Sequence, residues 1–357
     1  APGSVGLRVL PSNQVTVILP HSRKLANTLA HRLERDKTTM HHIAILDDYQ
    51  DKSLEAADWD SITDADVTVF TEFLGHDANR VTEILRPFDI IVAMRERTKF
   101  PSSIFENLPN LKLLVTTGMR NGSIDMLAAR AKGVDVCGTE MLPYPAFEHA
   151  WALILGLAKE LPKEDQTMKA GGWQEGFGIG LYGKTLGVLG LGKLGAQAAK
   201  VGLAFNMDVI AWSPNLTGER CAEVGVKLVS KEKLFRQSDV ITIHMVLSER
   251  SRDLVDAAEL SLMKSSAYLV NTSRGPIVNE TALLDTLRNR RIAGAGLDVF
   301  DIEPLPKDHP LRGLDNAVLT GHTGYVIAEL YDKVYGQAVE DIIGWMDKSP
   351  VRLLNGE

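Results

Sequence analysis

Three apolar, strand-like runs in the second half of the chain each lead into a residue that could do chemistry. Arg274 follows the run "YLVN", Glu303 comes shortly after "GLDVF", and His322 follows "AVLT". The carboxyl ends of strands in an open parallel sheet meet at one edge, where ligands bind. We therefore expect a cation, a carboxylate and an imidazole at one site. Gly321 and Gly324 flank the histidine, and residues without side chains leave an imidazole open to close approach.

These three groups together suit hydride transfer at a 2-hydroxy acid. An imidazole titrates near neutral pH, so His322 would take the hydroxyl proton in oxidation and return it in reduction. Glu303 would orient the ring and favour its protonated form. Arg274 would hold the carboxylate and polarise the carbonyl oxygen through its forked donors. Each residue alone has an ordinary structural explanation, and it is their placement at neighbouring strand ends that supports a joint role.

A glycine-rich turn, "VLGLGKLG", predicts a dinucleotide cofactor. Gly190, Gly192 and Gly195 have G-x-G-x-x-G spacing, after a predicted strand and at the start of a predicted helix. The first glycine would form the tight turn, the second would let the backbone approach a pyrophosphate, and the third would bring the helix close to the strand. Cofactor contacts are expected from Gly190, Gly192, Lys193, Leu194, Gly195, Ser213, Pro214, Asn215, Thr272, Asp298 and Gly324.

The choice between NAD and NADP depends on the end of the second strand of this unit, which reads "VIAWSPN". An acidic side chain there would hydrogen-bond the ribose of NAD and repel the extra phosphate of NADP. This chain has Ser213 instead. The cofactor is therefore NAD or NADP, and the missing carboxylate slightly favours NADP. No arginine is adjacent to clamp a phosphate, and Arg220 is the nearest one that follows.

Two series of short apolar runs predict the strands that position these residues. Five β-branched runs alternate with amphipathic stretches between His42 and Thr139, and six more follow between Lys184 and His322. Strands that alternate with helices indicate parallel sheets covered on both faces. Between the two series we expect a long helix over residues 143–161 and a glycine-rich loop over 171–183. Another long helix is expected over residues 327–346.

Composition narrows the class of protein. The chain has 357 residues and a net charge of −7, and it lacks a basic block, so a nucleic-acid partner is not expected. Its longest apolar run, Ala150–Ala158, is too short to span a bilayer. Cys137 and Cys221 offer no disulfide framework, which favours a reducing compartment such as the cytoplasm. Residues 1–39 are arginine-rich and acid-poor, as in an organellar transit peptide, or are an inert extension.

Four segments resemble, in order and spacing, the signatures of the D-isomer-specific 2-hydroxyacid dehydrogenase family: "VLGLGKLG", "NTSRGPIVNE", "GLDVFDIEPLP" and "TGHTGYV". The likeness runs from about Ile43 to Leu354. It implies an α/β fold with two doubly wound parallel-sheet domains, a Rossmann-like dinucleotide domain being inserted in a flavodoxin-like substrate domain. The expected division is an extension of uncertain role over residues 1–40, a substrate domain over 41–143 plus 326–357, and a dinucleotide-binding domain over 144–325.

The resemblance also implies roles for individual residues. Arg274, Glu303 and His322 match the catalytic triad of the family. The loop "TTGMRN" looks like the segment whose backbone amides hold the substrate carboxylate. The expected substrate contacts are Arg95, Gly118, Met119 and Arg274. Family members are commonly homodimers, and residues 145–173 look like the dimerisation arm. The chain departs from the family in having Gly321 where a proline is common. It also has Ser213 in place of the acidic side chain that would favour NAD.

The sequence thus predicts an oxidoreductase that transfers a hydride between NAD(P)H and a small 2-oxo acid, similar to glyoxylate or hydroxypyruvate reductases, with no metal. Phosphoglycerate as the substrate would need extra cations, for which Arg95, Arg97 and Arg120 are candidates. A nucleotide-sensing scaffold or corepressor related to these dehydrogenases is an alternative, and it would bind the cofactor without turnover. Formate dehydrogenase is a further alternative, but it would carry an amide in place of Glu303.

Overall fold

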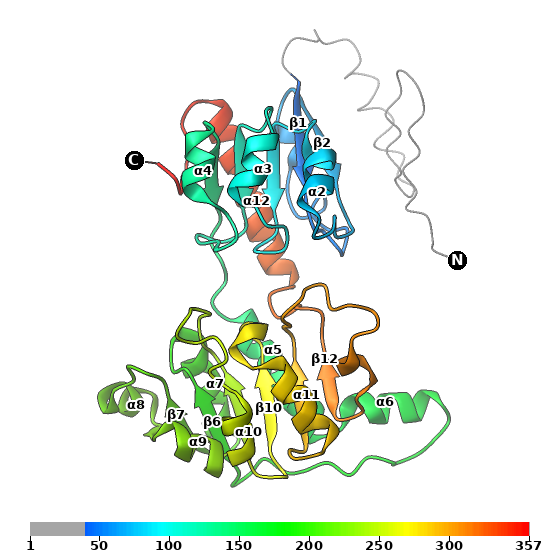
Figure 1. Cartoon of the computed structure of the whole chain (residues 1–357), viewed down its shortest axis with the longest axis vertical. Coiled ribbons are helices and arrows are strands. Elements are labelled where there is room, and N and C mark those ends of the chain that lie inside the picture. The colour runs from blue at the N-terminus through cyan, green and yellow to red at the C-terminus, as the bar shows by residue number, and fades with distance from the viewer. Residues whose placement is uncertain (1–39, 357) are drawn as a thin grey trace. The chain divides into compact units, whose positions relative to one another are not determined.

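The computed structural model describes residues 40–356, which contain two parallel β-sheets (Figure 1). The residues from His41 onward form one compact unit. The extension predicted from the composition of residues 1–39 lies outside the described residues. The predicted fold class, two doubly wound α/β sheets, is confirmed.

The first sheet has the strand order β2-β1-β3-β4-β5, which is the flavodoxin-like order. All its pairings are parallel. Its strands are β1 (His41–Ile45), β2 (Ala65–Val69), β3 (Ile90–Ala93), β4 (Leu113–Thr116) and β5 (Asp135–Gly138). Alternate side chains enter two cores, because successive residues of a strand point to opposite faces. Ile43 and Ile45 pack against α12 (Ala328–Met346), on one face. Ala44 and Leu46 face the opposite core, to which α2 (Ala78–Leu85), α3 (Ser102–Asn107) and α4 (Met126–Ala131) contribute.

The second sheet has seven parallel strands in the order β12-β11-β10-β9-β6-β7-β8. The order reverses direction at β6, which lies between β9 and β7, and such a switch point is where an open α/β sheet binds its ligand. The strands are β6 (Thr185–Leu189), β7 (Asp208–Trp212), β8 (Lys227–Leu228), β9 (Val240–Ile243), β10 (Tyr268–Asn271), β11 (Gly294–Leu297) and β12 (Ala317–Leu319).

Helices cover both faces of the second sheet. One face packs against α5 (Pro145–Ala158), α7 (Lys193–Ala204) and α8 (Gly218–Val224). The other packs against α9 (Lys231–Gln237), α10 (Ala257–Leu262) and α11 (Glu280–Arg288). Three short 3₁₀ helices complete the described elements: η1 (Trp59–Ser61), η2 (Gly275–Ile277) and η3 (Pro310–Gly313).

The long helix predicted over residues 143–161 is present as α5, which ends at Ala158, slightly earlier than predicted. A second helix that the sequence did not predict, α6 (Leu161–Lys169), begins after Glu160, whose φ of 51° is left-handed. Pro162 occupies the first turn of the second helix, where its missing N–H costs nothing. The glycine-rich segment that follows contains no helix or strand, as predicted.

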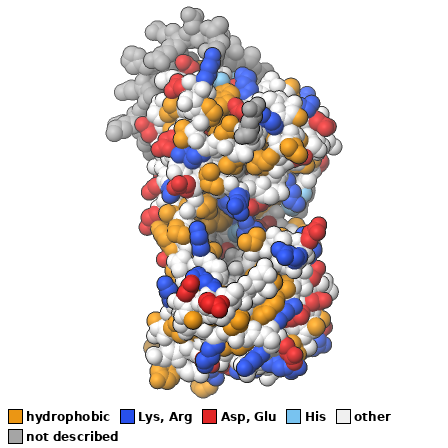
Figure 2. Space-filling model, turned by 90° about the vertical axis from the view of Figure 1, so that its left-hand side faces the viewer, with side chains coloured by type: hydrophobic (Ala, Val, Ile, Leu, Met, Phe, Trp, Pro, Cys, Tyr) orange, Lys and Arg blue, Asp and Glu red, His pale blue; other side chains and the backbone are white. Residues whose placement is uncertain are grey.

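The described part of the chain contains no helix that combines the length and the apolar character needed to cross a bilayer. It also contains no group of three or more histidine, cysteine or acidic residues that could hold a metal ion. On the face shown in Figure 2, acidic and basic side chains are interspersed among apolar ones.

Candidate active site

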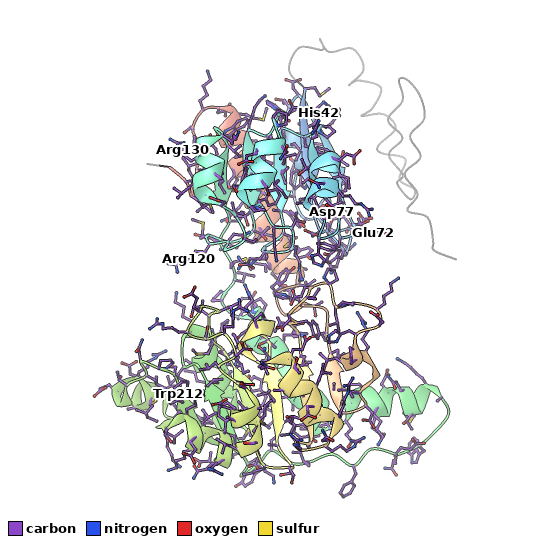
Figure 3. All side chains as sticks on the ribbon, viewed as in Figure 1. His42, Glu72, Asp77, Arg120, Arg130 and Trp212 are labelled. Atoms are coloured by element: carbon purple, nitrogen blue, oxygen red, sulfur yellow. The ribbon has the colours of Figure 1, made fainter. Side chains whose placement is uncertain are left out.

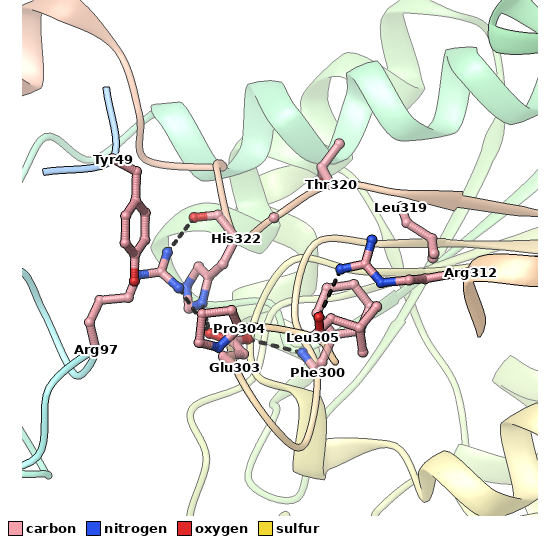
Figure 4. Close-up of a pocket in the computed structure, with 11 residues that line it drawn as sticks. Tyr49, Arg97, Phe300, Glu303, Pro304, Leu305, Arg312, Leu319, Thr320 and His322 are labelled. Carbon is pink, nitrogen blue, oxygen red and sulfur yellow. Dashed lines mark hydrogen bonds and ion pairs between the residues drawn. The ribbon is translucent and has the colours of Figure 1, made fainter. Parts of the chain in front are cut away.

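His322 and Glu303, predicted as partners, are in direct contact. Strand β12 ends at Leu319, and the loop that follows holds His322 at a φ of 54°, a left-handed conformation that non-glycine residues rarely adopt. The imidazole Nδ1 lies 2.6 Å from Oε2 of Glu303 (Figure 4). Because Nδ1 is engaged with the carboxylate, Nε2 remains the nitrogen that can exchange a proton with a ligand.

The histidine loop is anchored by Asp298, which comes directly after β11 and is 1% exposed. Its carboxylate accepts hydrogen bonds from the hydroxyl of Thr320 (2.6 Å) and from the backbone N–H groups of Thr323 (2.7 Å) and Gly324 (2.9 Å). A Cβ atom at Gly324 would lie 2.9 Å from Oδ2 of Asp298, so a glycine is needed for this approach. Asp298 thus fixes the loop, and its role as a cofactor contact stays a prediction.

Glu303 is ionised by its surroundings. Burial raises the pKa of the Glu303 carboxyl, but the hydrogen bond and charge of His322 outweigh that effect, aided by the Phe300 N–H and by Arg97. The pKa therefore lies below its ordinary value. The Phe300 N–H donates to Oε1 at 3.0 Å, and Arg97 Nη1 donates to Oε2 at 3.1 Å. The acid–base candidate thus faces a carboxylate held in one orientation by three donors.

The third member of the predicted triad, Arg274, has a different partner. Its Nη2 donates to Oε2 of Glu96 at 3.0 Å, and its Nη1 donates to the carbonyl oxygen of Ser273 at 2.7 Å. Arg95 binds the other oxygen of the same carboxylate, with Nη2 3.1 Å from Oε1 of Glu96. Two cations that were predicted to bind a substrate are therefore brought together by one carboxylate. Glu96 was not expected at this site from the sequence.

The predicted substrate loop is shaped by Gly118, whose φ is 112°. A Cβ atom there would lie 1.8 Å from Nη1 of Arg95, so only a glycine leaves room for that guanidinium. The Gly118 N–H donates to the Thr139 hydroxyl at 3.2 Å, so this amide already has a partner. Met119 is exposed beside it. The roles of both residues in substrate binding stay predictions.

A pocket of about 170 Å³ opens beside the histidine (Figure 4). Its wall contains both members of the His322–Glu303 pair, and Tyr49 and Arg97 enter it from the segments that follow β1 and β3. Loops that follow strands of both sheets therefore contribute residues to the wall of this one pocket. The remaining lining residues are Phe300, Pro304, Leu305, Arg312, Leu319, Thr320 and Gly321.

The glycine-rich turn has the geometry that a dinucleotide requires. Gly190 has a φ of 102°, and a Cβ atom there would lie 2.4 Å from the carbonyl oxygen of His244. A Cβ atom at Gly195 would lie 1.9 Å from the oxygen of Gly190, so α7 packs directly on the turn. Gly192 is the N-cap residue of α7, and a Cβ atom added there would meet nothing within 4 Å. No side chain accepts a hydrogen bond from the first turn, so the N-terminus of the helix is available to bind an anion. Thr272, another predicted contact, has a buried hydroxyl without a hydrogen-bond partner. These features fit a bound dinucleotide.

The residues predicted to decide between NAD and NADP follow β7, which ends at Trp212 (Figure 3). Ser213, Pro214 and Asn215 follow directly and bring no charge. Arg220, the next arginine along the chain, forms an ion pair on its own helix, with Nη1 2.9 Å from Glu223. Lys231 lies 6.0 Å from the centre of the Trp212 ring, and its amino group pairs with Glu259 at 2.8 Å. These contacts do not select between NAD and NADP. At the other end of the glycine turn, Lys193 and Leu194 form the first turn of α7.

A doubly wound sheet with such a turn defines a dinucleotide-binding α/β protein, and comparison with known proteins identifies the family. The model of the D-isomer specific 2-hydroxyacid dehydrogenase NAD binding domain matches residues 151–324. A glyoxylate reductase from Aeropyrum pernix is 36% identical over 265 residues, 71% of this chain and 79% of that protein. The structure of a phosphoglycerate oxidoreductase from Vibrio cholerae has a TM-score of 0.82 at 34% identity and covers 87% of this chain and 100% of that one. This chain belongs to the D-isomer specific 2-hydroxyacid dehydrogenase family.

Another relative is longer than this chain. A D-3-phosphoglycerate dehydrogenase from Archaeoglobus fulgidus is 36% identical over 264 residues, which are 73% of this chain but 50% of that protein. The chain thus spans about half the length of that relative.

Proposed function

We propose that this chain is an NAD(P)-dependent reductase that converts a small 2-oxo acid, glyoxylate or hydroxypyruvate, into the corresponding 2-hydroxy acid, with the D configuration where C2 is a stereocentre. The observation that carries the proposal is the 2.6 Å contact between His322 and Glu303, in a chain that also has a dinucleotide turn. The similarity to a glyoxylate reductase supports the same activity. We assign substrate binding to residues 41–143 plus 326–357 and cofactor binding to residues 144–325.

His322 is the proton donor in reduction. Glu303 binds Nδ1, which holds the ring in one orientation and stabilises its protonated form. Nε2 then gives a proton to the carbonyl oxygen as this atom becomes a hydroxyl, and it takes the proton back in the reverse direction. General acid catalysis of this kind contributes about 10²- to 10⁴-fold to the rate.

Arg274 anchors the substrate carboxylate and polarises the carbonyl oxygen. Two of its donors are fixed by Ser273 and Glu96, so its remaining N–H edge is held in place for a ligand. Arg95, which shares Glu96, adds a second positive charge. The backbone at Gly118 and Met119 completes the substrate site in this proposal.

The charges of the site favour a substrate with a single carboxylate. A phosphorylated substrate would need additional cations, for which Arg95, Arg97 and Arg120 were the candidates. Arg97 is ion-paired with Glu303 at 3.1 Å, and Arg95 is already assigned to the substrate carboxylate. Less positive charge is therefore left for a phosphate group, which supports the smaller 2-oxo acids.

The cofactor is held at the turn formed by Gly190, Gly192 and Gly195. The N-terminus of α7 binds its pyrophosphate through the backbone N–H groups of Lys193 and Leu194. A bound nicotinamide supplies the hydride for reduction. The other contacts proposed are Ser213, Pro214, Asn215, Thr272, Asp298 and Gly324. The absence of an acidic side chain at Ser213 makes NADP the slightly favoured cofactor.

A homodimer forms part of the proposal. Helix α6 and the residues that follow it carry large apolar side chains in contact with solvent, among them Leu161 (54% exposed), Met168 (51% exposed) and Trp173 (71% exposed). Exposed apolar groups gathered on one arm are typical of a surface that a second subunit covers. This supports the assignment of residues 145–173 to the dimerisation arm.

The test measures the loss of near-ultraviolet absorbance of NADH and NADPH with glyoxylate, hydroxypyruvate and a branched 2-oxo acid. Wild type and His322→Ala are compared, and NADH binding to both is measured by calorimetry. We expect turnover that His322→Ala reduces by about 10²-fold or more while NADH binding stays the same. Binding without turnover on any 2-oxo acid would favour the nucleotide-sensing scaffold, and oxidation of formate would favour formate dehydrogenase.

A further inference from the structure

Arg97 has the most extensive set of contacts with the acid–base pair. It follows β3 in the segment "MRERT", and its side chain is 7% exposed. Its Nη1 donates to Oε2 of Glu303 at 3.1 Å, and its Nη2 donates to the carbonyl oxygen of His322 at 2.8 Å. Figure 4 shows the guanidinium between these two acceptors. A residue attached to the first sheet thus contacts both members of a pair that is attached to the second.

A third partner fixes the plane of the guanidinium. Nε and Nη2 of Arg97 lie 3.3 and 3.1 Å from the hydroxyl of Tyr325, and the cation lies 5.6 Å from the centre of the tyrosine ring. The four hydrogen bonds leave only one of the five N–H donors of a guanidinium without a partner in the described structure. Arg97 is therefore poorly placed to bind a substrate phosphate through a bidentate contact.

The shared oxygen links Arg97 to the orientation of the imidazole. Oε2 of Glu303 accepts from both Nδ1 of His322 and Nη1 of Arg97. The carboxylate cannot rotate away from the ring without losing the charged donor. The hydrogen bond to the His322 carbonyl oxygen also holds a backbone whose φ of 54° is unfavourable for this residue type. The same cation therefore secures the side-chain partner and the backbone of the histidine.

We propose that Arg97 is a positioning residue for the acid–base pair and does not bind substrate: it fixes the Glu303 carboxylate and the His322 backbone so that Nε2 is presented to the 2-oxo acid. The proposal rests on the proposed function only for the last step, the presentation of Nε2 to a substrate. The positioning itself can be measured in the free protein.

Removing Arg97 changes both geometry and charge. The charged or titratable groups that face it are Asp47, Tyr49, Arg95, Glu303, His322, Tyr325 and Tyr331. Without the guanidinium, Glu303 has one fewer competing donor, and the imidazole has one fewer positive neighbour. A variant that keeps the charge, Arg97→Lys, separates the loss of geometry from the loss of charge.

The first experiment needs no substrate. Protein labelled with ¹⁵N-histidine should give a downfield Nδ1–H signal from the short His322–Glu303 hydrogen bond, identified by its absence in His322→Ala. The Nδ1 contact of His41 with Asp89, 2.5 Å long, provides an internal control at the far end of β1. We expect Arg97→Met to shift or broaden the first signal and to leave that of His41 unchanged. An unchanged first signal would overturn the proposal.

The second experiment separates positioning from substrate binding. With glyoxylate, Arg97→Met is expected to lower kcat about 10- to 100-fold with less than about a threefold change in KM, because a misplaced acid–base group slows chemistry more than binding. The control is Arg130→Met, on the outer side of α4 (Figure 3), where the arginine is half-exposed and pairs only loosely with Asp135 at 3.5 Å. A rise in KM with kcat unchanged would show instead that Arg97 binds substrate.

A conservative variant covers the case in which Arg97→Met does not fold. Arg97→Lys keeps the charge but has a single nitrogen, so it cannot hold Glu303, Tyr325 and the His322 carbonyl in the same arrangement. We expect a smaller change of the histidine signal and of kcat in the same direction, and wild-type values for both would contradict the proposal. If wild type reduces no 2-oxo acid, the proposed function fails, and the histidine signal still decides whether Arg97 positions the pair.

Discussion

Gly192→Ala should weaken dinucleotide binding without disturbing the fold. Gly192 caps α7 with a φ of −76°, which any residue can adopt, and a Cβ atom there would meet nothing within 4 Å. Gly195 provides the contrast, because a Cβ atom there would lie 1.9 Å from the carbonyl oxygen of Gly190. Gly192 is thus dispensable for packing, and Gly195 is not.

The expected magnitudes follow from these distances. An alanine in place of a glycine N-cap costs at most about 1 kcal/mol of stability, whereas the backbone clash at Gly195 is an overpacking that typically costs about 1–3 kcal/mol or more. For binding, the methyl group at position 192 occupies space that a pyrophosphate needs in order to reach the N–H groups of α7. Losing one charged hydrogen bond costs about 1.5–3 kcal/mol, which corresponds to about 10- to 100-fold weaker binding.

The assay uses no substrate. NADH affinity is measured by calorimetry, and melting temperature by circular dichroism, for wild type, Gly192→Ala and Gly195→Ala. Gly192→Ala should melt close to wild type and bind NADH about 10- to 100-fold more weakly, whereas Gly195→Ala should melt at a clearly lower temperature. Wild-type affinity in Gly192→Ala would refute the placement of the pyrophosphate at this turn. A fall in melting temperature as large as that of Gly195→Ala would refute the reasoning from open space.

Three further outcomes follow from the same structure. Ser213→Asp should weaken NADPH binding at least about tenfold relative to NADH, because a carboxylate repels the 2′-phosphate; an equal effect on both cofactors in calorimetry would contradict this. Burial lowers the pKa of His244 to about 4, so between about pH 6.5 and 4 the native state binds fewer protons than the unfolded chain. The free energy of unfolding should therefore fall as the pH drops through that window, and urea titrations of His244→Gln should show a flatter dependence. Burial also raises the pKa of the Cys137 thiol to about 12, so aromatic disulfide reagents should label it at neutral pH only after denaturation, and rapid labelling of the native protein would count against this burial.

Much of the fold could be predicted because parallel strands buried on both faces are continuous apolar runs. All eleven runs proposed as strands overlap strands of the structure. Strand β8 escaped prediction because it has only two residues, Lys227 and Leu228, and both are exposed at the edge of the sheet. Helix α6 was not predicted because Thr167 is the only one of its residues that is buried, so its sequence lacks the apolar pattern of a packed helix.

The candidate site was predictable to the extent that it lies at strand ends. His322 and Glu303 follow neighbouring strands, and the topology alone brings such residues together. Glu96 and Arg97 could not be assigned their partners from local pattern, because Arg274 and Glu303 lie far along the chain and belong to the other sheet. The contacts of Arg97 become visible only in the structure, in which loops of the two sheets line one pocket.

Two residues of the site have strained backbones, and in both cases distant side chains compensate. His322 and Arg95 have φ values of 54° and 50°. The carbonyl oxygen of His322 accepts from Arg97 (2.8 Å), and that of Arg95 accepts from the Asn121 side chain (2.7 Å). Strained conformations of this kind cost about 1–3 kcal/mol each and persist only where the surroundings over-determine them. Gly321 allows the histidine loop freedom that a proline would remove, so the contacts from Arg97 and Asp298 must supply the order that the loop sequence itself does not.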